Sequence, residues 1–186
     1  MNEISNEMKA ILIIFKDFNS FHNANNLSKK INITSMGTLK ILKDLEKKKI
    51  LISKQIGKAR FYKINFENNY AKTYLKFILE REAEETIPRI KKWIKEAKKL
   101  QEIADIGIIF GSVLHKEEHA DVDLFLLLNK KNNEKINKKI EEINKINLKK
   151  IHVLKQTEDD LLKNLKEKNN VILSAIKEGI IAFGYD

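Results

Sequence analysis

Two apolar runs separated by a short polar segment most constrain what the second half of this chain can fold into. The first run ends abruptly at Gly111-Ser112, and the second begins at Asp121-Val122-Asp123. Because side chains alternate along a strand, Asp121 and Asp123 are expected on one face. Neighbouring carboxylates repel each other unless a cation lies between them, and Mg²⁺ suits one or two carboxylates plus substrate phosphates. A Gly-Ser turn at a strand end offers N–H groups and a hydroxyl to phosphate oxygens. The pattern therefore predicts a metal and nucleotide site.

With Leu124 following, the same pattern resembles the nucleotidyltransferase (polymerase-beta-like) superfamily in its minimal archaeal and bacterial form. The resemblance covers about residues 100–185, and the ending NNVILSAIKEGIIAFG is also similar to the tail of that family. It implies that Gly111 and Ser112 bind the β- and γ-phosphates and that Asp121 and Asp123 hold Mg²⁺. The nearby Lys116 is a further candidate for a phosphate contact, although a lysine in a loop is more often simply solvated.

The resemblance also implies a reaction, in which a hydroxyl acceptor attacks the α-phosphorus of a nucleoside triphosphate, with ATP as the expected nucleotide. The family places a third carboxylate on the next strand, and here the matching strand, 148–154, has His152 at that place. A histidine titrates near neutrality and could act as the general base. The alternative is a passive replacement in a domain that has lost the transfer step and only senses nucleotide or oligomerises.

Positive charge is concentrated in the first third of the chain. Residues 1–66 hold 13 Lys and Arg against 5 Asp and Glu, a net charge of +8, whereas the whole chain carries +10. Such an imbalance indicates that the N-terminal part meets a polyanion. The alternative is a lysine-rich composition with solvated lysine faces.

The pattern of the first third predicts three helices followed by a hairpin. Helices are expected over 7–18, 24–31 and 34–48, the last capped by Thr34 or Ser35 with Leu39, Leu42 and Leu45 facing inward. Two β-type runs, 50–55 and 60–65, are joined around Gly57. This order resembles a winged helix-turn-helix domain, which implies a third helix in the major groove of double-stranded DNA and a wing on its backbone. The expected DNA-binding residues are Ser35, Thr38, Lys40 and Lys43 of the helix, and Lys54, Lys58 and Arg60 of the wing.

Taken together, these patterns predict an α+β chain with three parts. Residues 1–66 form the winged helix-turn-helix, 67–100 a helical connector or dimerisation segment, and 101–186 a small mixed-sheet α/β domain. Tyr70, Tyr74, Phe77 and Ile78 are expected to form one stripe of the connector, and Pro88 to open its second helix.

Composition excludes some functions and leaves several open. There is no cysteine, so disulfides and Cys-metal sites are excluded, and the absence of a signal peptide or long apolar span predicts a soluble, cytoplasmic protein. The main hypothesis is a DNA-binding protein, expected as a homodimer, whose second domain binds Mg-NTP and transfers NMP. A non-catalytic regulator and an antitoxin-like protein with a toxin partner are the alternatives.

Overall fold

The computed structural model describes residues 4–116, 118, 120–128 and 133–185, and it confirms the α+β class. Contacts between Cα atoms divide the chain into two compact units, Met1–Arg81 and Glu82–Asp186. The division falls inside helix α4 (Asn69–Glu85) rather than at residues 66 and 100. Residues 69–81 of α4 therefore belong to the first unit, and the remainder of the helix belongs to the second.

The first unit has the winged helix-turn-helix order of elements. Helices α1 (Asn6–Lys16), α2 (Ala24–Ile31) and α3 (Ser35–Lys47) are followed by the antiparallel strands β1 (Leu51–Ile56) and β2 (Ala59–Ile64). All three helices begin at a side chain that accepts a backbone N–H, which satisfies a donor that the first turn leaves free. The capping residues are Ser5, Asn23 and Thr34.

A third strand segment, which the sequence patterns did not predict, joins the hairpin. His22 forms an isolated antiparallel bridge with Tyr62 of β2, whose backbone N–H donates to the His22 carbonyl at 2.8 Å. The segment between α1 and α2 is thereby fixed beside the hairpin. One bridge is too short for the period-2 pattern by which strands are found in a sequence.

Helix α4 buries one stripe and exposes another. Ala71, Leu75 and Ile78 are buried, whereas Tyr70 and Phe77 are 58% and 45% exposed. Ile78 therefore does not belong to the aromatic stripe that the sequence pattern predicts. Helical spacing explains the difference, since positions 71, 75 and 78 share a face and 70, 74 and 77 share the next one.

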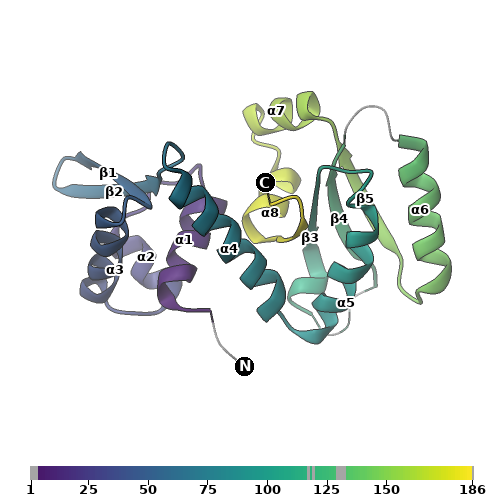
Figure 1. The fold of residues 1–186 in the computed structure, drawn as a ribbon, viewed down its shortest axis with the longest axis horizontal. Helices are drawn as coiled ribbons and strands as arrows, with labels where there is room; N and C mark the ends of the chain where they lie inside the picture. Colours follow the sequence, from purple (N-terminus) through teal and green to yellow (C-terminus); the bar gives the residue numbers. More distant parts are fainter. Residues whose placement is uncertain (1–3, 117, 119, 129–132, 186) are drawn as a thin grey trace. The chain divides into compact units, whose positions relative to one another are not determined.

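The second unit is a four-stranded mixed sheet with helices on both faces (Figure 1). The strand order is β5-β4-β3-β6, in which β4 and β5 are parallel and the other two pairs antiparallel. Its strands are β3 (Ile106–Phe110), β4 (Val122–Leu127), β5 (Ile151–Gln156) and β6 (Ile180–Phe183). Its helices are α5 (Pro88–Ala97), α6 (Asn133–Ile146), α7 (Glu158–Lys166) and α8 (Asn170–Glu178), with short 3-10 turns η1 (Lys98–Leu100) and η2 (Gly111–Leu114).

Alternation along the strands gives this sheet two apolar cores. Ile109 and Leu124 pack with side chains of α5 and α6 on one face. Ile108 and Phe125 pack on the other face with α8 and with partly buried leucines of α7. Both faces of the central strands are therefore covered, and polar side chains can meet only at the strand ends.

None of the helices in the described part of the chain is long and apolar enough to cross a membrane.

Candidate functional site

The exposed face of α3 carries a line of lysines. Lys40, Lys43 and Lys47 are exposed and follow one another at helical spacing, with Met36, 75% exposed, one turn before them. The sequence pattern predicted Lys40 and Lys43 as DNA-binding residues but not Lys47. The same spacing of three and four residues would have found it. Three positive charges on one helix face form a surface suited to phosphate groups.

Thr38 does not belong to this surface, and that prediction is corrected. Its side chain is fully buried, and its Oγ1 donates to the Thr34 carbonyl at 3.0 Å. Thr38 shares its face with the buried Leu42 and Leu45, so the inward stripe of α3 begins at residue 38 rather than at Leu39. A hydroxyl that satisfies itself on its own helix can take such a core position at little cost.

Ser35 lies at the start of α3 and is exposed, but it is also engaged within the fold. Its Oγ lies 3.1 Å from the Oγ of Ser28 in α2, and the preceding Thr34 caps the helix by accepting from Gly37 N at 3.1 Å. These two contacts fix the turn between α2 and α3. The connection between α2 and α3 therefore holds the first helical turn of α3, which contains Ser35 and Met36, in place.

The three predicted wing cations do not face the same way. Lys54 is opposite Phe61 in the register, whereas Arg60 is opposite Gln55 and therefore points to the other face of the hairpin. Lys58 lies beside Gly57 in the turn that joins the strands. Lys54 and Lys58 remain exposed cations of the wing, and Arg60 turns toward α3.

Arg60 is part of a polar contact that ties the wing to α3. Its Nη1 lies 3.4 Å from Oε2 of Glu46, and the Ser53 hydroxyl also donates to Glu46. Burial raises the pKa of the neighbouring Tyr62, the Glu46 charge adds to the rise, and Arg60 opposes it. The guanidinium is thus paired with a carboxylate of α3, and its role in DNA binding stays a prediction.

In the second unit the predicted acidic residues meet at one end of the sheet. Asp123 pairs in register with Phe110 at the end of β3 and with His152 near the start of β5, and Asp121 immediately precedes β4. The Nε2 of His152 lies 3.5 Å from Oδ2 of Asp121. Both side chains are about half exposed, at 62% and 44%, so solvent and solutes reach them. The structure therefore places these three residues at the same end of the sheet, with the side chains of Asp121 and His152 close together.

Gly111 shapes the same site by leaving room for a carboxylate. It has a φ of +80°, and a Cβ there would lie 2.2 Å from Oδ2 of Asp123. An L side chain would therefore meet both a strained backbone and the carboxylate. Glycine at this position lets the turn after β3 approach Asp123 directly.

The other two predicted nucleotide-binding residues lie in and after η2. Ser112 is partly buried, and its carbonyl accepts from the N–H groups of His115 and Lys116 at 3.1 and 2.9 Å. The Lys116 side chain is exposed. Among the residues that the structure describes, no group of three or more His, Asp or Glu side chains converges closely enough to hold a metal ion by itself.

Comparisons with known proteins leave the family open. No family profile and no curated protein sequence matches the chain. A MarR-family transcriptional regulator from Rhodococcus sp. RHA1 has 9% identity and a TM-score of 0.34, with 53% of this chain and 74% of that chain covered. A single-site mutant of Lactococcus lactis ZitR has 13% identity and a TM-score of 0.30, with coverage of 55% and 76%. Likeness at this level identifies no family for this chain.

Proposed function

We propose that this chain is a DNA-binding transcription regulator that holds double-stranded DNA against α3 and the wing of its first unit. The observation that carries the proposal is the exposed lysine line, Lys40, Lys43 and Lys47, on the third helix of a winged helix-turn-helix order. In that arrangement the third helix enters the major groove and the wing follows the backbone. Lysines then supply salt-dependent affinity, and side chains of the first turn reach base edges.

Local contacts support this use of α3. The ion pair between Arg60 and Glu46 and the contact between Ser28 and Ser35 hold the wing and α2 against the helix. A helix fixed on both sides loses little conformational freedom when it binds. Ser35 and Met36 occupy its first turn, and N-terminal residues of a recognition helix commonly contact bases.

The proposal is tested by binding to a fluorescently labelled random-sequence duplex, measured by anisotropy. The variant replaces the three α3 lysines together, Lys40→Gln/Lys43→Gln/Lys47→Gln. A matched control removes the same charge at the same kind of spacing from exposed positions of α5 and η1, Lys91→Gln/Lys95→Gln/Lys98→Gln. We expect the α3 variant to lose at least about tenfold in affinity and the control to lose much less. Equal losses would contradict a role for α3.

A second candidate function is the binding of Mg-NTP by the second unit. It is supported by the glycine at position 111, which gives access to Asp123, and by the meeting of Asp121, Asp123 and His152 at the strand ends. The two carboxylates would hold Mg²⁺, whose charge would stabilise the phosphates. Gly111, Ser112 and Lys116 would lie around those phosphates.

If the site is catalytic, the unit transfers a nucleotidyl group. An acceptor hydroxyl would form a bond to the α-phosphorus, pyrophosphate would leave, and the hydroxyl proton would pass to Nε2 of His152. Melting curves with and without MgATP test the binding step, and Asp121→Asn/Asp123→Asn is the matched variant. Transfer is tested with α-labelled ATP and cell extract. Label on a macromolecule with wild type alone would establish the transfer. An MgATP shift without label would support nucleotide sensing instead.

A further inference from the structure

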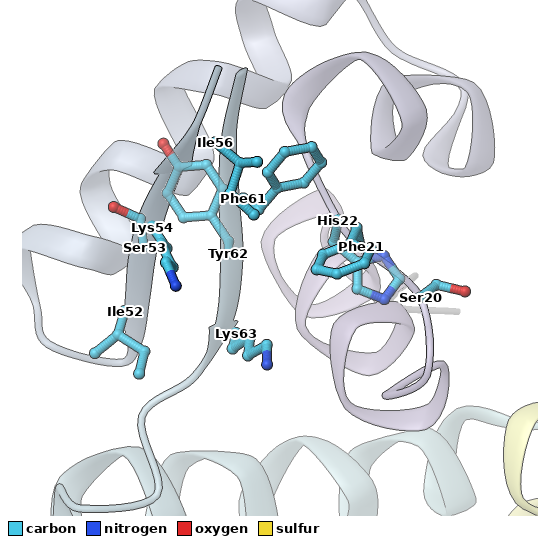
Figure 2. A pocket seen from close by; sticks show the side chains of 10 residues that line it. All are labelled: Ser20, Phe21, His22, Ile52, Ser53, Lys54, Ile56, Phe61, Tyr62 and Lys63. Atoms are coloured by element: carbon cyan, nitrogen blue, oxygen red, sulfur yellow. The ribbon is translucent and has the colours of Figure 1, made fainter. Parts of the chain in front are cut away.

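A hollow of about 410 Å³ opens in the first unit between the hairpin and the segment that joins α1 and α2 (Figure 2). This volume lies within the roughly 300–1,000 Å³ of small-molecule pockets. Phe21 comes from the segment before α2, and Ile56 and Phe61 come from the hairpin. The hollow exists because His22 bridges to β2 and so fixes this segment beside the sheet.

The walls of the hollow are apolar although much of their surface meets solvent. Phe21, Ile52 and Ile56 are 62%, 50% and 46% exposed. The rings of Phe21 and Phe61 meet edge to face, with centroids 5.5 Å apart. Several large apolar side chains gathered in one concave place on a small unit mark a binding surface more often than scattered ones do. An aromatic or short aliphatic body would fill this space.

Two lysines belong to the same face of the hairpin. Ile52 and Lys54 lie two residues apart on β1 and therefore share a face. Their register partners on β2, Lys63 and Phe61, lie on the same face. Both lysines line the hollow and are exposed. Within the described part of the chain no carboxylate forms an ion pair with either of them, in contrast to Lys30, which lies 2.7 Å from Asp17. Their charges remain available to an anion beside an apolar surface.

We propose that this hollow binds a small molecule that has an aromatic or short aliphatic body and one anionic group. The body packs against Phe21, Ile56 and Phe61, and the anionic group lies between the apolar floor and the amines of Lys54 and Lys63. An apolar lining with a few placed polar groups is the usual composition of a ligand site. A charged contact beside a partly desolvated surface then selects anions over neutral molecules.

The position of the hollow also predicts coupling to DNA, and this part alone rests on the proposed function. Lys54 lines the hollow and is a wing cation proposed to meet the DNA backbone. An anion at Lys54 competes with phosphate for the same amine. Ligand binding therefore lowers DNA affinity, and by reciprocity DNA lowers ligand affinity.

The test uses the full chain and 1-naphthoate as the probe, with binding measured by isothermal titration calorimetry. The neutral 1-naphthylmethanol and the cationic 1-naphthylmethylammonium are the ligand controls. Lys63→Gln is the site variant, since Lys63 lines the hollow and is not among the proposed DNA-binding residues, and Lys72→Gln on α4 is the matched control. We expect saturable 1:1 binding of 1-naphthoate and weaker binding of both controls. Lys63→Gln should weaken binding of 1-naphthoate about twofold to fivefold, as expected for one partly exposed charged contact.

Three outcomes overturn the ligand site. These are no saturable binding of 1-naphthoate, equal binding of the three probes, or equal affinities of Lys63→Gln and wild type. The calorimetry requires no DNA, so its result stands even if the chain fails to bind a duplex. The coupling is measured separately, as the shift in the DNA-binding midpoint at saturating 1-naphthoate. A chain that binds both ligands without such a shift keeps the ligand site and loses the coupling.

Discussion

At the scale of single residues, Thr38 shows how one polar residue changes the interpretation of a helix. Its hydroxyl is buried and donates to the Thr34 carbonyl. Thr38→Val keeps the shape and removes the hydrogen bond, so we expect a loss of about 1 kcal/mol in the free energy of unfolding and unchanged DNA affinity. Denaturant titration and anisotropy measure the two quantities. A marked loss of DNA affinity in the folded variant would show instead that Thr38 contributes to DNA binding.

Gly111 offers a second test at this scale, with Gly57 as its matched control. Both have positive φ, but a Cβ at position 57 has no atom within 4 Å, whereas one at 111 meets Asp123. Gly111→Ala and Gly57→Ala should each cost about 1–2 kcal/mol for the backbone conformation. In Gly111→Ala the Asp123 side chain can rotate away from the new methyl group, which takes its carboxylate out of the position proposed to hold Mg²⁺. Only Gly111→Ala should therefore abolish the MgATP-dependent rise in melting temperature. Retained binding in Gly111→Ala would count against the nucleotide site.

At the scale of elements, α4 is tied to α1 by one strong hydrogen bond. The Tyr74 hydroxyl donates to Glu7 at 2.6 Å, and burial, followed by this hydrogen bond, raises the pKa of Tyr74 well above its usual value. Because the pKa of Tyr74 is higher in the folded chain than in the unfolded chain, Tyr74 adds to the free energy of unfolding at a pH below the unfolded pKa, which is about 10. This contribution is lost as the pH rises above about 10. Tyr74→Phe should therefore be less stable than wild type at neutral pH by about 1 kcal/mol. The difference should shrink above about pH 10, which chemical unfolding across pH would measure. A difference independent of pH would contradict the assignment.

The elements themselves were largely predictable, because their signals are local. The cap at Thr34, Pro88 at the start of α5 and the apolar runs of β3 and β4 all mark boundaries that the structure contains. The single bridge at His22 was not predictable, since it depends on a partner far along the chain. The inward face of α3 was misassigned because a threonine that bonds its own helix looks like any polar residue in a sequence.

The site residues divide in the same way. Alternation correctly predicted that Asp121 and Asp123 share a face, and the order of the strands brought His152 beside them. The ion pair of Arg60 with Glu46 could not be predicted, because the face of a hairpin residue depends on the register, which the sequence leaves open. The roles of these residues in binding remain predictions.

At the scale of the whole molecule, we expect the chain to work as a homodimer. An aromatic stripe is exposed on α4 and just before it, and it consists of Phe66, Tyr70 and Phe77. The rings of Tyr70 and Tyr74 are stacked, with their centroids 6.1 Å apart. Tyr70→Ser/Phe77→Ser should shift the chain toward monomer in sedimentation equilibrium. Ile146→Ser/Leu148→Ser, which removes two exposed apolar side chains of the second unit, is the matched control. A monomeric wild type, or equal shifts in both variants, would contradict this interface.

The most direct test of the central claim is the salt dependence of duplex binding. Each lysine that neutralises a phosphate contributes about 0.9 to the slope of log affinity against log salt concentration. Removing Lys40, Lys43 and Lys47 together should therefore lower the slope by about 2–3, whereas removing Lys91, Lys95 and Lys98 should leave it nearly unchanged. That result would establish α3 as the face that meets DNA. A slope that neither variant changes, or that both change equally, would contradict it.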